Sequence, residues 1–254
     1  MLSAIVQTVS PNISQCELTF LKREPIDYEK AVSQHEAYCA LLEKCGAKVN
    51  KLTANVDYPD GTFVEDTAVV LDEIAVLASM GTESRRGEIA AIETELAKYR
   101  KVVRVPPSAR LEGGDVLALG STVFVAASTR TDRAGIAALR KHLKPFDYDV
   151  VPVNIQNCLH LKSACSAISD RSLLVNPDWV DITPFAEFNV ITVSQDEPYA
   201  ANAIRVNETV CMYAGFANTV DMVRELGFKV ATVDISEFLK AEGGMSCLSL
   251  QFES

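Results

Sequence analysis

The sequence has no excess of positive charge and no long apolar run. It holds 24 lysines and arginines against 34 aspartates and glutamates, a net charge of −10, so it presents no basic surface for nucleic acid. No apolar run approaches the length that spans a membrane, and the N-terminus lacks the basic region of a secretory signal. We expect a cytoplasmic protein that binds neither nucleic acid nor membrane.

Paired cysteines and flexible linkers are also missing. The chain has an odd number of cysteines, seven, and no Cys-x-x-Cys spacing. This pattern predicts free thiols in a reducing compartment, not a disulfide framework or a zinc site. No Gly/Ser-rich or Pro-rich linker interrupts the 254 residues. One domain over residues 1–254, large enough to bury a substantial core, is therefore favoured.

The chain does contain a repeated order of predicted elements. Apolar residues recur at helical spacing over residues 28–45, 83–99, 132–143 and 217–226, and weakly over 178–186, where Pro184 interrupts the pattern. A β-rich stretch follows each of these segments, at 48–52, 101–105, 149–153, 188–193 and 229–233. Pairs of short strands precede the helices, with turn-forming residues at Asp72, Gly120, Asp170 and Asn207.

A polar or reactive residue stands at the start of each strand pair. These residues are Asp66, Glu112, His160, Asn202 and Cys247, at intervals of 46, 48, 42 and 45 residues. Such a period is typical of repeated supersecondary units. The last unit has one strand only, and the strand predicted at residues 4–8 would pair with it and close a ring. We predict an α/β fold of five such units around an axis, with these residues meeting at one end.

Cys247 and His160 are the candidate nucleophile and proton carrier. Cys247 follows the pair Gly243–Gly244, which lets the backbone turn sharply and expose the sulfur. A cysteine before a C-terminal strand is more often a small buried hydrophobe, but a histidine in a matching unit favours catalysis. Imidazole moves protons near neutral pH. The other histidines, His35 and His142, lie in predicted helices and look structural.

Three acids stand at the starts of two apolar strand pairs, namely Glu65, Asp66 and Glu112. Solvated loop acids are the usual case, but buried carboxylates need partners. A guanidinium, with several N–H donors, is a natural one. Arg85 and Arg130 lie near helix starts, either as ordinary surface arginines or as two forks that hold a carboxylate. Their spacing does not choose between these alternatives.

Seven motifs together resemble the dimethylarginine dimethylaminohydrolase family, within the guanidino-group-modifying (pentein) superfamily. They are Phe-Val-Glu-Asp at 63–66, Ser-Arg-Arg at 84–86, Glu-Gly-Gly-Asp-Val at 112–116, Arg-Thr-Asp at 130–132, Leu-His-Leu-Lys-Ser at 159–163, Tyr-Ala-Ala-Asn at 199–202 and Ser-Cys at 246–247. They span nearly the whole chain. The resemblance implies a five-bladed α/β propeller with the site in its central channel, in agreement with the repeat.

The resemblance also implies hydrolysis of Nω-methylated arginine to citrulline and a methylamine, with no metal and no organic cofactor. Cys247 would attack the guanidinium carbon, and His160 would protonate the departing amine and then activate water. Glu112 and Asp66 would hold the guanidinium nitrogens. The other implied substrate-binding residues are Arg85 and Arg130 for the α-carboxylate, and Asp60, Glu65 and the backbones of Leu18 and Ala241 for the rest of the amino acid. Leu18 would lie on a mobile lid.

Two departures from the family's motifs lie away from the expected reacting centre, and a third position discriminates between substrates. Arg-Thr-Asp at 130–132 replaces the more familiar Arg-Thr-Asn, and Ala241 replaces a larger aliphatic residue. Lys162 stands where arginine deiminases, which are similar in chemistry, typically carry an aspartate. The missing carboxylate favours a methylated substrate. Arginine deiminase or amidinotransferase activity, and a non-catalytic guanidino-compound binder, stay open as alternatives.

Two further expectations concern ionisation and assembly. If the cationic substrate creates the Cys247 thiolate, the pKa of this thiol in the free protein should lie near or above its usual value of about 8.5. An open strand edge between the first and last units would leave room for a homodimer.

Overall fold

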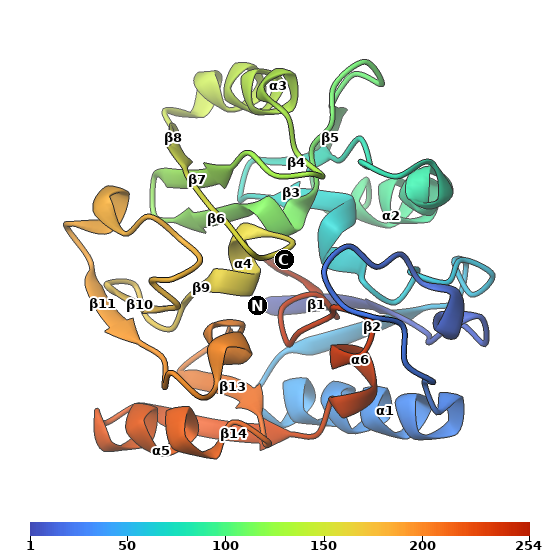
Figure 1. Cartoon of the computed structure of the whole chain (residues 1–254). Helices are drawn as coiled ribbons and strands as arrows, with labels where there is room; N and C mark the ends of the chain where they lie inside the picture. Colours follow the sequence, from blue (N-terminus) through green and yellow to red (C-terminus); the bar gives the residue numbers. More distant parts are fainter.

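The computed structural model describes residues 1–254. Five three-stranded sheets surround a common axis, and the longer helices lie on the outside (Figure 1). The strands are β1 (Leu2–Gln7), β2 (Lys48–Leu52), β3 (Ala68–Val70), β4 (Ile74–Leu77), β5 (Lys101–Arg104), β6 (Val116–Leu119), β7 (Thr122–Ala126), β8 (Asp149–Val153), β9 (Cys165–Ala167), β10 (Ser172–Val175), β11 (Asn189–Thr192), β12 (Ile204–Val206), β13 (Thr209–Tyr213), β14 (Lys229–Val233) and β15 (Leu250–Glu253). The helices are α1 (Tyr28–Lys44), α2 (Ile89–Leu96), α3 (Arg133–Leu143), α4 (Leu161–Ala164), α5 (Ala217–Glu225) and α6 (Ser236–Leu239).

All five sheets share one topology, which confirms the predicted repeat. In each, the first strand pairs antiparallel with the second, and the second pairs parallel with the third, as in β3-β4-β5 and β6-β7-β8. In four units a tight turn joins the first two strands, whereas β15 and β1 come from opposite ends of the chain. A longer connection leads to the third strand in every unit. That connection carries α2, α3, α5 or α1 in four units.

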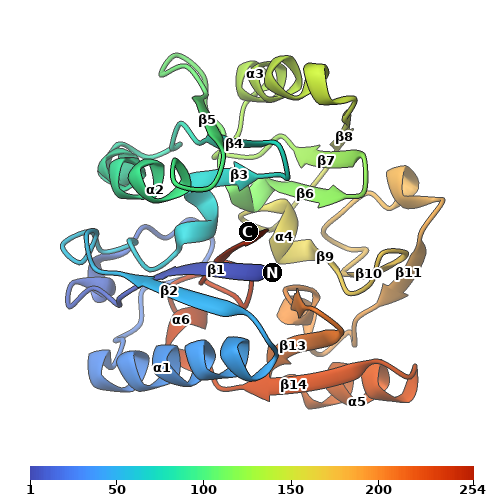
Figure 2. The same ribbon diagram turned by 180° about the vertical axis from the view of Figure 1, so that it is seen from behind.

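The ring closes through the two ends of the chain. β1 pairs antiparallel with β15, with Ala4 opposite Gln251, and parallel with β2. Both termini lie near the centre of the molecule in the two views (Figures 1 and 2). The predicted closure is confirmed. Because β1 is the central strand of this sheet, the open edge expected between the first and last units is not there.

Two predicted helices are shorter than expected. Over residues 83–99 the chain first forms a 3₁₀ helix, Glu83–Glu88, and only then α2. Over residues 178–186 only the 3₁₀ helix Thr183–Phe185 forms, because Pro184 lacks the N–H that an α-helix would need there. Elsewhere the predicted ends hold: the Asp132 side chain accepts from Gly135 N at the start of α3. No helix combines the length and apolar character needed to cross a bilayer.

The hydrophobic core is a ring of clusters between neighbouring units. One cluster joins β4 to β7 and to the inner face of α3, through Val76, Val123, Val125, Ile136 and Leu139. Such burial stabilises the fold in proportion to the apolar area removed from water. The axis itself holds buried polar groups, among them Glu112, Asp66 and His160. Buried charges are costly unless paired, so this polar centre needs a specific arrangement.

Candidate active site

The structure brings the predicted chemical residues together at one end of the axis. A small cavity of about 20 Å³ is lined by Glu17, Asp60, Phe63, Asp66, Arg85, Arg130, Leu159, His160, Ala241, Glu242, Gly243 and Cys247. Seven of the ten residues expected from the sequence line this cavity. Glu112 contacts one of the seven, His160. Glu65, Glu112 and Leu18 do not line it.

His160 occupies the centre of a ring of carboxylates. It directly precedes α4, and its Nε2 lies 2.8 Å from Glu112 Oε2 while its Nδ1 lies 3.7 Å from Asp66 Oδ1. Burial alone would lower the pKa of His160, but the negative charges around it, led by Asp66 and Asp115, raise the pKa to about 9. The imidazole is therefore protonated at neutral pH and can act as an acid.

Glu112 contacts His160 and a backbone N–H in this structure. Its Oε1 accepts from Gly81 N at 2.8 Å and its Oε2 faces His160. Burial opposes ionisation of Glu112, but the hydrogen bond and charge of His160 lower its pKa. With both oxygens occupied by protein groups, Glu112 orients and charges the imidazole.

Asp66 and Arg85 form a buried ion pair inside the cavity wall. Arg85 Nη1 donates to Asp66 Oδ2 at 2.7 Å, and Arg85 Nη2 donates to Glu88 Oε2 at 3.0 Å. Burial opposes the ionisation of Asp66, but the positive charges of His160 and Arg85 lower its pKa. No sequence pattern pointed to Glu88, which lies on the 3₁₀ turn that also carries Arg85.

Two buried polar atoms in the cavity wall have no hydrogen-bond partner. They are Asp66 Oδ1, an acceptor, and Arg130 Nη1, a donor. Arg130 Nη1 lies 3.6 Å from Glu112 Oε1, and Arg130 Nη2 donates to Thr19 Oγ1 at 3.3 Å. An unsatisfied buried polar atom is costly. The cavity is therefore suited to a ligand that offers an N–H donor to Asp66 and an acceptor to Arg130.

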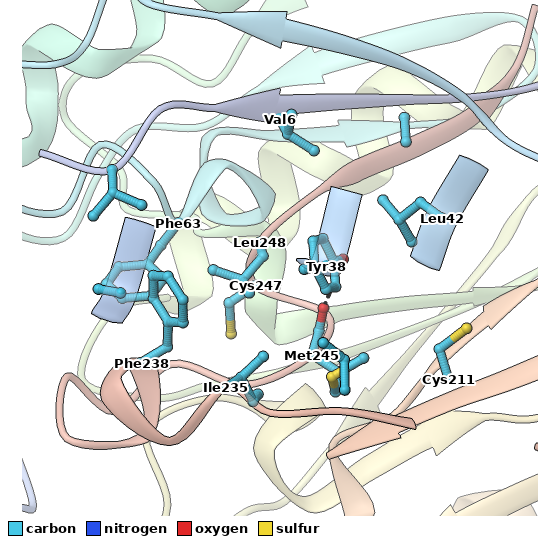
Figure 3. Close-up of a cluster of buried hydrophobic side chains, with 14 of the residues drawn as sticks. Val6, Tyr38, Leu42, Phe63, Cys211, Ile235, Phe238, Met245, Cys247 and Leu248 are labelled. Carbon is cyan, nitrogen blue, oxygen red and sulfur yellow. Dashed lines mark hydrogen bonds between the residues drawn. The ribbon is translucent and has the colours of Figure 1, made fainter. Parts of the chain in front are cut away.

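Cys247 brings its sulfur to the same cavity. Figure 3 shows its side chain among Phe63, Phe238 and Leu248, and Sγ accepts from Gly244 N at 3.3 Å. Burial, followed by the negative charges of Glu65 and Asp66, raises the pKa of the Cys247 thiol to about 12. This agrees with the expectation of a thiol that is neutral until a cation arrives.

Alkylation tests this ionisation state. Because the pKa of Cys247 lies far above neutrality, we expect its reaction with iodoacetamide to rise about tenfold per pH unit between about pH 6 and 9 in the ligand-free protein. Peptide mass spectrometry of Cys247 measures the rate, with Cys247→Ser to assign the label. A plateau of the rate below pH 7 would mean that a thiolate exists without ligand.

Asn202 fixes the loop that carries the cysteine. Its side-chain amide donates to Lys162 O at 2.9 Å and to Ser246 Oγ at 3.1 Å, and its Oδ1 accepts from Ser246 N at 3.0 Å. The Asn202 amide thus ties the residue before Cys247 to the segment after His160. These contacts give Asn202 a structural role beside the site.

Gly114 allows the histidine and the aspartate to approach. A Cβ on Gly114 would lie 2.7 Å from both Asp66 Oδ1 and His160 Nδ1. Only glycine leaves room for this arrangement, because real Cβ atoms do not approach heavy atoms so closely. The paired glycines after Glu112 are therefore needed by the site as well as by the turn.

Glu65 does not line the cavity in this structure. It accepts from Lys162 Nζ at 2.7 Å and from Ser246 Oγ at 2.6 Å, and it lines a separate cavity on the other side, with Lys162 and Gln251. Glu65 and Asp66 are consecutive in the 3₁₀ helix Val64–Thr67. With three residues per turn, neighbouring side chains diverge by about 120°.

One cluster offers donor atoms that suit a metal ion, namely Asp66, Glu112 and His160, within 4.8 Å of one another. In this cluster the Glu112 and His160 donors face each other, and Arg85 pairs with Asp66. A cation bound here would have to replace those contacts, so the protein's own positive groups already neutralise the carboxylates.

The fold and the site are matched by a known family. The family model described as "N,N dimethylarginine dimethylhydrolase, eukaryotic" matches residues 5–252. The chain belongs to this family. Curated relatives named N(G),N(G)-dimethylarginine dimethylaminohydrolase share 35% identity in Pseudomonas aeruginosa, over 89% of this chain and 90% of the relative, and 33% in Streptomyces coelicolor, over 98% and 96%.

Solved structures of dimethylarginine dimethylaminohydrolases have the same architecture. A cysteine-to-serine mutant from Pseudomonas aeruginosa complexed with citrulline has a TM-score of 0.92 and 32% identity, covering 99% of this chain and all of that one. A histidine-to-glycine variant, present as an adduct with S-methyl-L-thiocitrulline, has a TM-score of 0.94 and 33% identity over similar coverage. The five-bladed pentein fold is thereby established for this chain.

Proposed function

We propose that this protein hydrolyses Nω-methylated arginine to citrulline and a methylamine through a covalent intermediate on Cys247. The observation that carries the proposal is the pair of unpartnered buried atoms, Asp66 Oδ1 and Arg130 Nη1, in the same cavity as the Cys247 sulfur. A guanidinium supplies N–H donors for the first, and an α-carboxylate supplies an acceptor for the second.

Substrate binding follows from the charges of the cavity wall. Asp66 holds the guanidinium nitrogens, and Arg130, with Arg85 beside it, holds the α-carboxylate. Asp60 lies in the wall and offers a carboxylate for the α-amino group, together with the backbone of Ala241. Leu18 belongs to the segment that covers the cavity, and we assign its backbone to the same group. Glu65 instead holds Lys162.

Catalysis then uses the protonated imidazole. The arriving cation favours ionisation of the Cys247 thiol, which loses its proton to solvent. The resulting thiolate bonds to the guanidinium carbon. His160 protonates the leaving methylamine, because an amine departs readily only in its neutral form. The neutral imidazole next takes a proton from water, and the resulting hydroxide attacks the covalent intermediate. Citrulline forms and the cysteine is released.

A substrate panel with product identification tests this function. We expect asymmetric dimethylarginine to yield citrulline and dimethylamine, with kcat/KM at least about tenfold above that for ammonia release from free arginine. Position 162 holds a lysine instead of an aspartate, and the carboxylate of Glu65 is paired with that lysine. Neither residue therefore offers a free carboxylate to hold an unmethylated nitrogen. Faster ammonia release from arginine would indicate a deiminase, and covalent trapping of Cys247 by a haloamidine without any turnover would indicate a binding protein.

We further propose that residues 1–254 act as one domain, in the cytoplasm and without a metal or organic cofactor. All seven cysteines are free, as in proteins of reducing compartments. Each step above uses only side chains of the protein, the substrate and water. The homodimer expected from the sequence stays a prediction, which sedimentation velocity measures.

A further inference from the structure

The cavity at the site is closed in this structure. Its volume of about 20 Å³ is far below the roughly 300 Å³ or more of ordinary ligand sites, so an amino acid enters only if part of the wall moves. A second cavity of about 310 Å³ adjoins the first and shares Leu159, Glu242 and Gly243 with it. Phe20 and Leu21 line this outer cavity, and Glu17 lines the inner one. The segment 17–21 therefore borders both.

One side chain holds this segment by its backbone. The Glu242 carboxylate accepts from three consecutive N–H groups, those of Thr19 at 3.0 Å, Phe20 at 2.5 Å and Leu21 at 2.6 Å. Consecutive N–H groups that converge in this way form an anion-binding nest. Hydrogen bonds to a charged acceptor are about twice as strong as neutral ones.

The backbone of Glu242 also adopts an unusual conformation. Its φ of 58° places a non-glycine residue in the left-handed region, which is costly unless the surroundings hold it there. The other hydrogen bonds of the segment involve Glu17 and the Thr19 side chain: Asp60 accepts from Glu17 N at 3.1 Å, Ser84 Oγ donates to Glu17 Oε1 at 2.5 Å, and Arg130 Nη2 donates to Thr19 Oγ1 at 3.3 Å. Glu242 is the group that fixes the end of the segment nearer to the outer cavity.

We propose that Glu242 is the latch of a lid formed by residues 17–21, a positioning residue that sets how readily substrate enters and product leaves. This inference deepens the proposed function and rests on it for its kinetic part. The latch itself is a property of the ligand-free protein. When the Glu242 contacts break, the lid moves outward and the two cavities merge into one of the size that an amino acid needs.

Limited proteolysis of the ligand-free protein tests the latch without an activity assay. Lys22 and Arg23 directly follow the lid and are exposed, so trypsin cuts there when the lid opens. We expect Glu242→Ala to be cut at these sites at least about tenfold faster than wild type, and Glu242→Gln to lie between, because its amide keeps one acceptor oxygen. The matched control is Glu225→Ala, an exposed glutamate at the end of α5.

The kinetic readout separates the latch from a direct contact with substrate. With the latch broken, KM for asymmetric dimethylarginine should rise about tenfold while kcat stays equal or increases, because the lid limits release. Cleavage of Glu242→Ala at the wild-type rate overturns the latch, and a raised KM with unchanged cleavage assigns Glu242 to the substrate's ammonium group instead. If no guanidine is turned over, the proposed function fails while the proteolysis still decides on the latch. Thermal melting of both Glu242 variants, and cutting at other lysines, exclude general unfolding.

Discussion

Replacing Cys247 with serine lowers the turnover of asymmetric dimethylarginine by about four orders of magnitude or more. The residues that line the cavity otherwise offer only carboxylates, two arginines, a histidine and apolar or glycine positions. None of these supplies a sulfur nucleophile. A serine hydroxyl would have to lose its proton beside Asp66, and the charge that already opposes ionisation of the thiol opposes an alkoxide more strongly.

The measurement is citrulline formation in wild type and Cys247→Ser, with binding of citrulline followed separately by calorimetry. Serine is close in shape, and its oxygen can accept from Gly244 N as the sulfur does, so the fold and the binding of product should persist. Cys39→Ser, on α1 and away from the cavity, is the matched control and should keep its activity. A Cys247→Ser variant as active as wild type would require a different nucleophile.

The fold could be predicted from the sequence because each repeated unit has a local sequence pattern. Turn residues such as Gly120 and Asn207 adopt positive φ between paired strands, and β-rich stretches follow amphipathic helices in a fixed order. The short helix at Thr183–Phe185 was the weak point: Pro184 made the helical signal ambiguous, and packing of the buried Phe185 against Phe124 decided the geometry there. Such contacts join positions about 60 residues apart and are invisible in a local pattern.

For the site, the sequence predicted which residues take part but not the contacts that each side chain makes. Cys247, His160 and Asp66 were identified and do meet at one cavity. The contacts of Glu65 with Lys162 and Ser246, and of Glu112 with His160, could not be read from the sequence. In the 3₁₀ helix that carries Glu65 and Asp66, a shift of one residue turns a side chain by about 120°. Glu88 and Glu242 had no signal at all, since an acid in a loop is usually solvated, and Asp115 appeared only as part of a motif. The burial of Glu88 and Asp115, and the contact of Glu242 with the backbone of the lid, appear only in three dimensions.

Replacing His160 with glycine should stop the second half of the reaction more completely than the first. S-methyl-L-thiocitrulline distinguishes the two halves, because its leaving group departs as a thiolate and needs no proton from the protein. We expect His160→Gly to form the covalent adduct on Cys247 and to retain it, since no imidazole remains to activate water. Mass spectrometry of the intact protein should show wild type free of adduct at steady state and the variant fully modified.

The same imidazole sets the alkaline limb of the pH profile. His160 must be protonated to release an amine, and its pKa of about 9 places that loss above pH 9. With dimethylarginine as substrate, kcat should therefore fall as pH rises through about 9, whereas adduct formation from S-methyl-L-thiocitrulline should not. A common fall for both substrates would place the titrating group elsewhere.

If instead His160→Gly releases its adduct at the wild-type rate, the histidine acts on the leaving group alone, and another group in the cavity activates water. Asp66 would be the candidate, because its Oδ1 is the one buried acceptor in the wall that no protein donor occupies.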